Sequence, residues 1–109
     1  MNTYEICLAD WEPLLPSLAA LLGAPYEPGE FDRAEEQFHA RAQAHGPARQ
    51  AWRLAGPAGQ LTVWLEAFEG YAFGTLQATD AVLREGGALL WQAYLQQGGN
   101  PRAAEPPPR

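Results

Sequence analysis

Lysine is absent from this chain of 109 residues, and all seven basic residues are arginines. Thirteen acidic residues give a net charge of −6, and the charge is unevenly placed. Met1 to Gly46 holds eight acids and two arginines, whereas the remaining residues hold five of each. A chain without a basic cluster offers little to a phosphate backbone or to an anionic lipid surface. We therefore expect neither nucleic acid nor a membrane as a partner.

Cysteine is nearly absent as well, because Cys7 is the one cysteine in the chain. This count excludes an intramolecular disulfide and a cysteine-rich zinc site, and it fits a reducing compartment. The first residues carry acids where a secretory signal carries basic residues. The longest apolar patch, Leu18 to Ala24, is far shorter than the ~20 residues that cross a bilayer. We expect a soluble cytoplasmic protein.

Motifs with a known chemistry are missing too: there is no glycine-rich phosphate loop, no G-x-S-x-G elbow and no H-E-x-x-H pair. A weak metal candidate comes from Asp32, Glu35 and His39, which would share one face of a helix. The alternative is that the two acids cap that helix and the histidine is solvated. Since no second histidine–carboxylate cluster exists, we predict no metal, no cofactor and no catalytic residues, and an enzyme is not favoured.

The most definite structural signal is the stretch Arg49 to Ala78, which predicts three antiparallel strands. Gly56-Pro57-Ala58-Gly59 forms the first turn, because glycine allows positive φ and proline presets φ near −65°. Glu69-Gly70 suits a two-residue hairpin loop. A single helix over the same stretch is the competing interpretation. It would place Gly70 and Gly74 inside a helix, at a cost of roughly 1 kcal/mol each.

The predicted strands have two unlike faces, because strand side chains alternate. Pairing around the Glu69-Gly70 loop puts Trp64 opposite Thr75 and Glu66 opposite Phe73. The first turn places Trp52 and Leu54 on an aliphatic face, which also collects Leu61, Val63, Leu65, Ala67, Ala72, Gly74, Leu76 and Ala78. The second face is aromatic and collects Trp64, Phe68, Tyr71 and Phe73, with Glu66 and Arg53.

The rest of the chain predicts one strand and three helices. The strand is Thr3 to Leu8, and the helices end near Leu22, His45 and Gln97. Within the last helix, Gly86-Gly87 marks either a break or a close approach of another backbone. The fold class is therefore α+β: a two-layer domain over residues 1–97 with a three- or four-stranded, mainly antiparallel sheet, helices on one face and the order β-α-α-β-β-β-α. Residues 98–109, rich in proline, are predicted to be a flexible tail.

Three interpretations of the aromatic face remain open. It is a self-association surface, since exposed aromatics with arginine are common in protein contacts. It lines a pocket for a small hydrophobic or aromatic molecule, with Arg53 and Glu66 as orienting groups. Or it is simply the core, with the register assigned backwards or a helix folded over it. We favour the first and predict a protein that acts through protein contacts, as an adaptor, chaperone or inhibitor does, and that forms a homodimer through its sheet.

Overall fold

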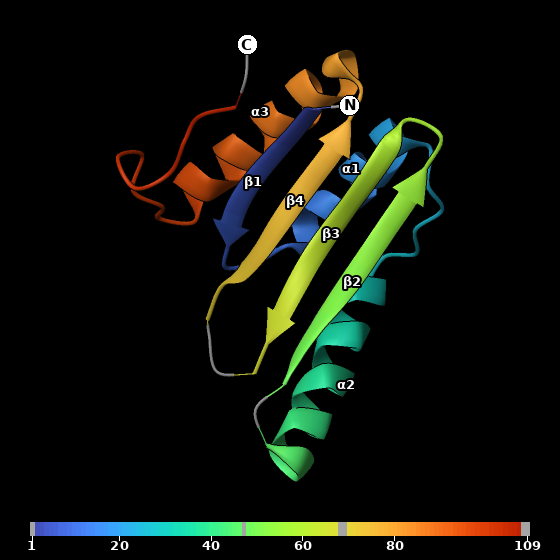
Figure 1. Ribbon diagram of the computed structural model, residues 1–109, viewed down its shortest axis with the longest axis vertical. Helices are drawn as coiled ribbons and strands as arrows, with labels where there is room; N and C mark the ends of the chain where they lie inside the picture. Colours follow the sequence, from blue (N-terminus) through green and yellow to red (C-terminus); the bar gives the residue numbers. More distant parts are fainter. Residues whose placement is uncertain (1, 47, 68–69, 108–109) are drawn as a thin grey trace.

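The computed structural model describes residues 2–46, 48–67 and 70–107 and shows two layers, a sheet with helices behind it (Figure 1). The strands are β1 (Asn2–Leu8), β2 (Arg49–Gly56), β3 (Gly59–Glu66) and β4 (Ala72–Ala78). The helices are the short 3-10 helix η1 (Glu12–Leu14), α1 (Leu15–Leu22), α2 (Glu30–His45) and α3 (Asp80–Gln96). The predicted α+β class and the order β-α-α-β-β-β-α are confirmed.

The sheet is antiparallel throughout and has the strand order β1-β4-β3-β2. The hairpin of β2 and β3 has the predicted register, with Trp52 opposite Val63 and Leu54 opposite Leu61. Trp52 and Leu54 therefore face the helices, as expected. Trp52 packs edge-on against Phe31 of α2, with ring centroids 5.1 Å apart.

The predicted register of β3 against β4 is wrong by two residues. Trp64 lies opposite Phe73 instead of Thr75, so the midpoint of the hairpin lies one residue earlier in the chain than the Glu69-Gly70 loop placed it. The two strands also end short of that predicted loop, since β3 ends at Glu66 and β4 begins at Ala72. A shift of two keeps every side chain on its predicted face, since strand side chains repeat with period two. Phe68 and Glu69 lie outside the described residues.

The core lies between the aliphatic face of the sheet and the helices. Leu61 and Val63 of β3 are fully buried, and so are Leu18 and Leu22 of α1. Tyr4, Ile6 and Leu8 on alternate positions of β1 complete this layer. Within the described part of the chain, no helix has the length and apolar character needed to cross a bilayer.

Trp11 is a central core residue that the sequence analysis did not identify. It lies immediately before η1, is 1% exposed, and its indole N–H donates to the carbonyl oxygen of Ala72 over 2.9 Å. Its ring lies over Gly74 of β4, where an ideal Cβ would come within 2.5 Å of Cζ2 of Trp11. Gly74 is therefore a notch in the sheet that the tryptophan ring fills.

The expectation that Asp32 and Glu35 cap α2 is wrong. The helix begins two residues earlier, at Glu30, after Gly29 in a left-handed conformation with φ of 86°. The start of α2 is held instead by the carboxylate of Glu12. It accepts hydrogen bonds from the Gly29 backbone N–H and from the Tyr26 hydroxyl.

Gly86 and Gly87 lie within one continuous α3 helix, so of the two alternatives for this pair the helix break is wrong. Gly86 faces Leu76 of the sheet, and Gly87 faces Pro107 and Tyr4. The chain after α3 folds back along β1 as far as Pro107 (Figure 1). There the Tyr4 hydroxyl donates to the carbonyl oxygen of Glu105 over 3.1 Å. Small residues on α3 thus make room for the sheet and for the returning chain.

Candidate interaction surface on the sheet

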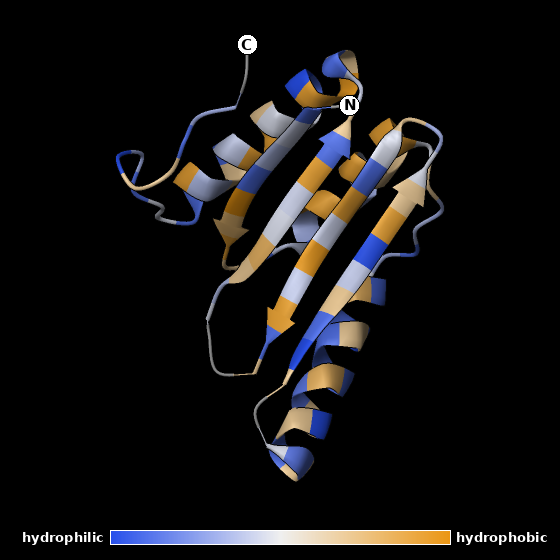
Figure 2. Cartoon of the chain, viewed as in Figure 1, coloured by the Kyte–Doolittle hydropathy of each residue, from blue (hydrophilic) through white to orange (hydrophobic). Residues whose placement is uncertain are grey.

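The face of the sheet that points away from the helices carries the aromatic residues. We call it the open face. Hydrophobic and hydrophilic residues alternate along its strands (Figure 2), as expected when only one face is buried. Its side chains are Thr3, Glu5, Cys7, Arg49, Ala51, Arg53, Ala55, Gln60, Thr62, Trp64, Glu66, Phe73, Thr75 and Gln77.

Helices do not cover the open face in the part of the chain that the structure describes (Figure 1). Trp64 and Phe73 are only half-buried, whereas their neighbours Leu65 and Gly74 on the opposite face are buried. The interpretation that the aromatic face is the covered core is therefore wrong. Two large aromatic side chains remain partly in contact with solvent at the middle of the sheet.

An apolar row crosses all four strands of the open face. Cys7 of β1 lies opposite Phe73 of β4, Phe73 lies opposite Trp64 of β3, and Trp64 lies opposite Ala51 of β2. The predicted surface contained Trp64 and Phe73 but not their adjacency, which results from the two-residue shift in register. We refer to Cys7, Phe73, Trp64 and Ala51 as the aromatic row.

The side chain of Arg49 on β2 contacts both Trp64 and Glu66 of β3. Its guanidinium carbon lies 4.4 Å from the centre of the indole ring, a cation–π contact. Its Nε also lies 3.6 Å from the Glu66 carboxylate. Glu66 therefore has Arg49 as its cross-strand ion-pair partner, whereas Arg53 lies two rows further along the open face, opposite Thr62.

The next row of the open face has opposite charges at its two ends. It runs from Glu5 on β1 through Thr75 and Thr62 to Arg53 on β2. Glu5 and Arg53 are both exposed, and among the described residues neither has an ion-pair partner. Since β1 and β2 are the two edge strands, one edge of the open face is acidic and the other is basic.

Of the remaining predicted surface residues, Tyr71 is 60% exposed and lies just before β4. Glu66 is half-buried beside Arg49, and Phe68 falls outside the described residues. Sequence reasoning missed Arg49 and Glu5. Arg49 is four residues before Arg53 in the same strand, so the alternation of strand side chains could have placed it on the same face. The position of Glu5 depends on the pairing of β1 with β4, which no local pattern specifies.

The weak metal candidate is not assembled into a cluster. Among the described residues, no group of three or more histidine, cysteine, aspartate or glutamate side chains could hold a metal ion.

Asp32 is exposed, whereas Glu35 and His39 are half-buried along α2 beside a cleft of about 20 Å³. Desolvation raises the pKa of the Glu35 carboxyl, His39 lowers it, and Asp32 and Asp10 raise it further. Desolvation, followed by the carboxylates of Glu12 and Asp10, raises the pKa of Asp32.

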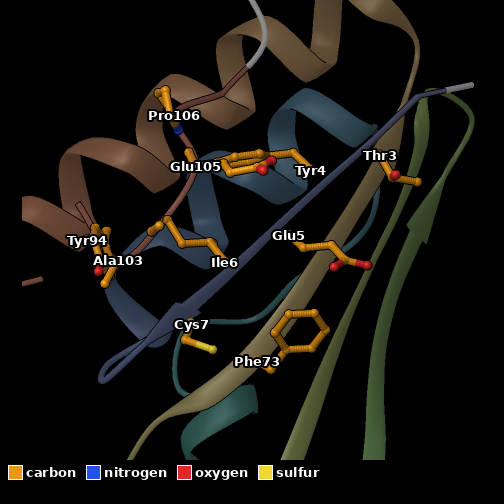
Figure 3. Close-up of a pocket in the computed structure, with 11 residues that line it drawn as sticks. Thr3, Tyr4, Glu5, Ile6, Cys7, Phe73, Tyr94, Ala103, Glu105 and Pro106 are labelled. Atoms are coloured by element: carbon orange, nitrogen blue, oxygen red, sulfur yellow. The ribbon is translucent and has the colours of Figure 1, made fainter. Parts of the chain in front are cut away.

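A groove of about 740 Å³ runs along the outer edge of β1. Residues 103–106 of the returning chain form its other wall, and Tyr94 of α3 also lines it. Figure 3 shows Tyr4 and Ile6 directed towards that chain and Glu5, Cys7 and Phe73 on the opposite side of β1. Two members of the aromatic row, Cys7 and Phe73, thus line the groove from the open face.

Raising the pH should loosen the attachment of the returning chain. Burial, with a smaller effect of Tyr94, raises the pKa of Tyr4 to about 12, above the value of about 10 in an unfolded chain. The folded state therefore binds more protons, and the associated stability is complete below pH ~10 and lost as the pH approaches ~12. We expect the melting temperature to fall over this range, measured by circular dichroism. Tyr4→Phe should fall less steeply, and an equal slope would contradict the assignment to Tyr4.

Comparison of the chain with protein-family models, with curated protein sequences and with solved structures finds no match. The fold defines the class, a two-layer α+β protein with a four-stranded antiparallel sheet.

Proposed function

We propose that this protein acts through protein–protein contacts made by the open face of its sheet, and that it associates with itself through that face. An adaptor, a chaperone or an inhibitor works by such contacts, and we place this role in the cytoplasm. The observation that carries the proposal is the aromatic row, in which Trp64 and Phe73 lie side by side and no helix of the described chain covers them.

The chemistry of the open face supports a contact surface. Trp64 has its ring orientation restrained by Arg49 before any partner arrives, which lowers the entropy lost on binding. Tryptophan, tyrosine and arginine are the residues that most often dominate binding energy at protein interfaces. Thr62 and Thr75 flank the row on one side and Arg49 and Glu66 flank it on the other, as in the polar rim of such interfaces.

The size of the open face indicates a moderate affinity. Four strands spaced by about 4.8 Å, each seven or eight residues long, give a footprint of roughly 19 by 25 Å, or about 500 Å². A typical stable interface buries about 800 Å² on each partner. Interfaces below the standard size are typically weak or transient, so we expect self-association with a dissociation constant on the order of micromolar.

Sedimentation velocity over a concentration series tests the proposal. The mean mass should rise from that of one chain to that of two as the concentration passes through the micromolar range. A mass that stays at 11.9 kDa up to hundreds of micromolar would remove self-association. Mass measurements in moderate and high salt would then separate aromatic packing, which salt affects little, from charge pairing.

The groove beside β1 favours a second candidate, the binding of a small hydrophobic or aromatic molecule. Its volume of about 740 Å³ lies within the range of ligand sites, and Phe73 and Tyr94 offer aromatic walls. Unlike the site predicted from the sequence, this groove contains neither Trp64 nor Arg53.

A fluorescent hydrophobic probe, anilinonaphthalene sulfonate, distinguishes the two candidates. If the groove binds such molecules, Tyr94→Ala should reduce the probe's fluorescence several-fold, because Tyr94 lines the groove and lies on α3, away from the open face. Trp64→Ala should leave it unchanged. Equal fluorescence in both variants and in the parent protein would remove the groove as a hydrophobic site.

A further inference from the structure

We infer that the partner on the open face is a second copy of this chain, related by a two-fold axis that runs parallel to the strands between β4 and β3. This inference rests on the proposed function and specifies its geometry. The two sheets would face one another about 10 Å apart, as in other sheet-on-sheet packings. In this arrangement β1 lies over the partner's β2, and β4 lies over the partner's β3.

The aromatic row is self-complementary under this axis. The axis passes between Phe73 and Trp64, which lie opposite each other on neighbouring strands. Each Phe73 therefore faces Trp64 of the second copy, and four aromatic rings meet at the centre. At the ends of the row, Cys7 of one copy faces Ala51 of the other. The ends of the two aromatic rows are therefore both small residues, which can approach each other closely.

The row that runs from Glu5 through Thr75 and Thr62 to Arg53, which we call the charged row, is also self-complementary under this axis. Glu5 and Arg53 lie at opposite ends of one row, on the two edge strands. The axis brings Glu5 of each copy opposite Arg53 of the other, so two equivalent ion pairs flank the aromatic centre. Neither side chain has an ion-pair partner among the described residues of its own chain. The second copy supplies one.

The other face-to-face arrangement is disfavoured by charge. A two-fold axis that crosses the strands places each strand over its own copy. When that axis passes through the charged row, Arg53 faces Arg53 and Glu5 faces Glu5. When it passes through the aromatic row, Arg53 faces Arg49 of the second copy. Like charges opposed at an interface weaken association, so the axis parallel to the strands is preferred.

A charge exchange tests this geometry. Glu5→Arg alone and Arg53→Glu alone each put two like-charged pairs across the interface, and each should weaken dimerisation about tenfold or more. The double variant E5R/R53E recreates both pairs with the charges reversed. It should return the dissociation constant to within about threefold of the parent value, as a double-mutant cycle requires for residues in contact. Sedimentation velocity measures all three.

Arg84→Glu is the matched control. Arg84 is exposed on α3, away from the open face, and its change alters the net charge by the same amount as Arg53→Glu. It should leave the dissociation constant within about threefold. If the double variant is as weak as the single ones while the parent protein dimerises, the axis is wrong and the proposed function stands. If the parent protein is monomeric, the axis and the proposed self-association are both wrong.

Thiol crosslinking gives an independent measurement of the same axis. In the proposed dimer the two Cys7 residues are roughly 17 Å apart, from strand spacings of about 4.8 Å and a sheet separation of about 10 Å. Ala51→Cys places a second thiol directly opposite Cys7 of the other copy. A short bismaleimide should therefore link Ala51→Cys chains into dimers and leave the parent protein unlinked. Efficient linkage of the parent protein would overturn the axis, because it requires β1 to lie against β1.

Discussion

Trp64→Ala should weaken self-association by a factor of about 30 or more. A central, well-packed tryptophan of an interface typically contributes at least about 2 kcal/mol, which corresponds to that factor. Trp64 lies in the middle of the aromatic row, and its loss also leaves the Arg49 guanidinium without its ring partner. The dissociation constant from sedimentation velocity measures the effect, and the melting temperature should change little because Trp64 is outside the core.

Trp91→Ala is the matched control for this substitution. Trp91 is also half-buried, but it lies on α3, where it stacks on Tyr94 with ring centroids 5.5 Å apart. Its removal should leave the dissociation constant of the dimer unchanged within about twofold. If Trp91→Ala weakens association as much as Trp64→Ala does, the contact lies on the helices and the assignment to the open face is wrong.

Trp11→Ala should lower the free energy of unfolding by about 3–5 kcal/mol, the usual loss when a buried large aromatic side chain is truncated. Trp11 is 1% exposed, and its removal also leaves the carbonyl oxygen of Ala72 without its indole donor. Since a domain of this size is typically stable by only about 5–15 kcal/mol, the loss would be large. Urea denaturation followed by circular dichroism measures it.

Gly74→Ala tests the same contact from the sheet side. A Cβ at Gly74 would collide with the ring of Trp11, so overpacking should cost roughly 1–3 kcal/mol. Gly70→Ala is its control, because a Cβ at Gly70 meets nothing within 4 Å of the described atoms. A Gly74→Ala variant as stable as the parent protein would show that the ring of Trp11 does not fill the notch.

The parts of the fold that were predictable are those that local patterns determine. The Gly56-Pro57-Ala58-Gly59 turn has strong backbone preferences, so the register of β2 against β3 followed correctly from the sequence. Glu69-Gly70 is a weaker signal, and the register of β3 against β4 was wrong by two residues. The period of two preserved the faces, which is why Trp64 and Phe73 were still assigned to one surface.

Long-range strand pairing limited how much of the candidate site could be predicted from the sequence. That β1 joins the sheet beside β4 depends on the whole fold, so Glu5 could not be placed on the open face opposite Thr75. Trp11 was missed for a related reason. It lies in an irregular segment between β1 and η1, where neither strand nor helix periodicity applies. Only the position of Gly74 in an otherwise aliphatic strand face pointed to a bulky neighbour.

Hydroxyl-radical footprinting with mass spectrometry is the most direct measurement of the central claim, since it locates the surface that association covers. The protein would be labelled well below and well above the dissociation constant found by sedimentation. We predict that Trp64 and Phe73 lose reactivity at the higher concentration while Trp91 and Leu95 on α3 keep theirs. Loss of reactivity on α3 with unchanged Trp64 and Phe73 would contradict the account.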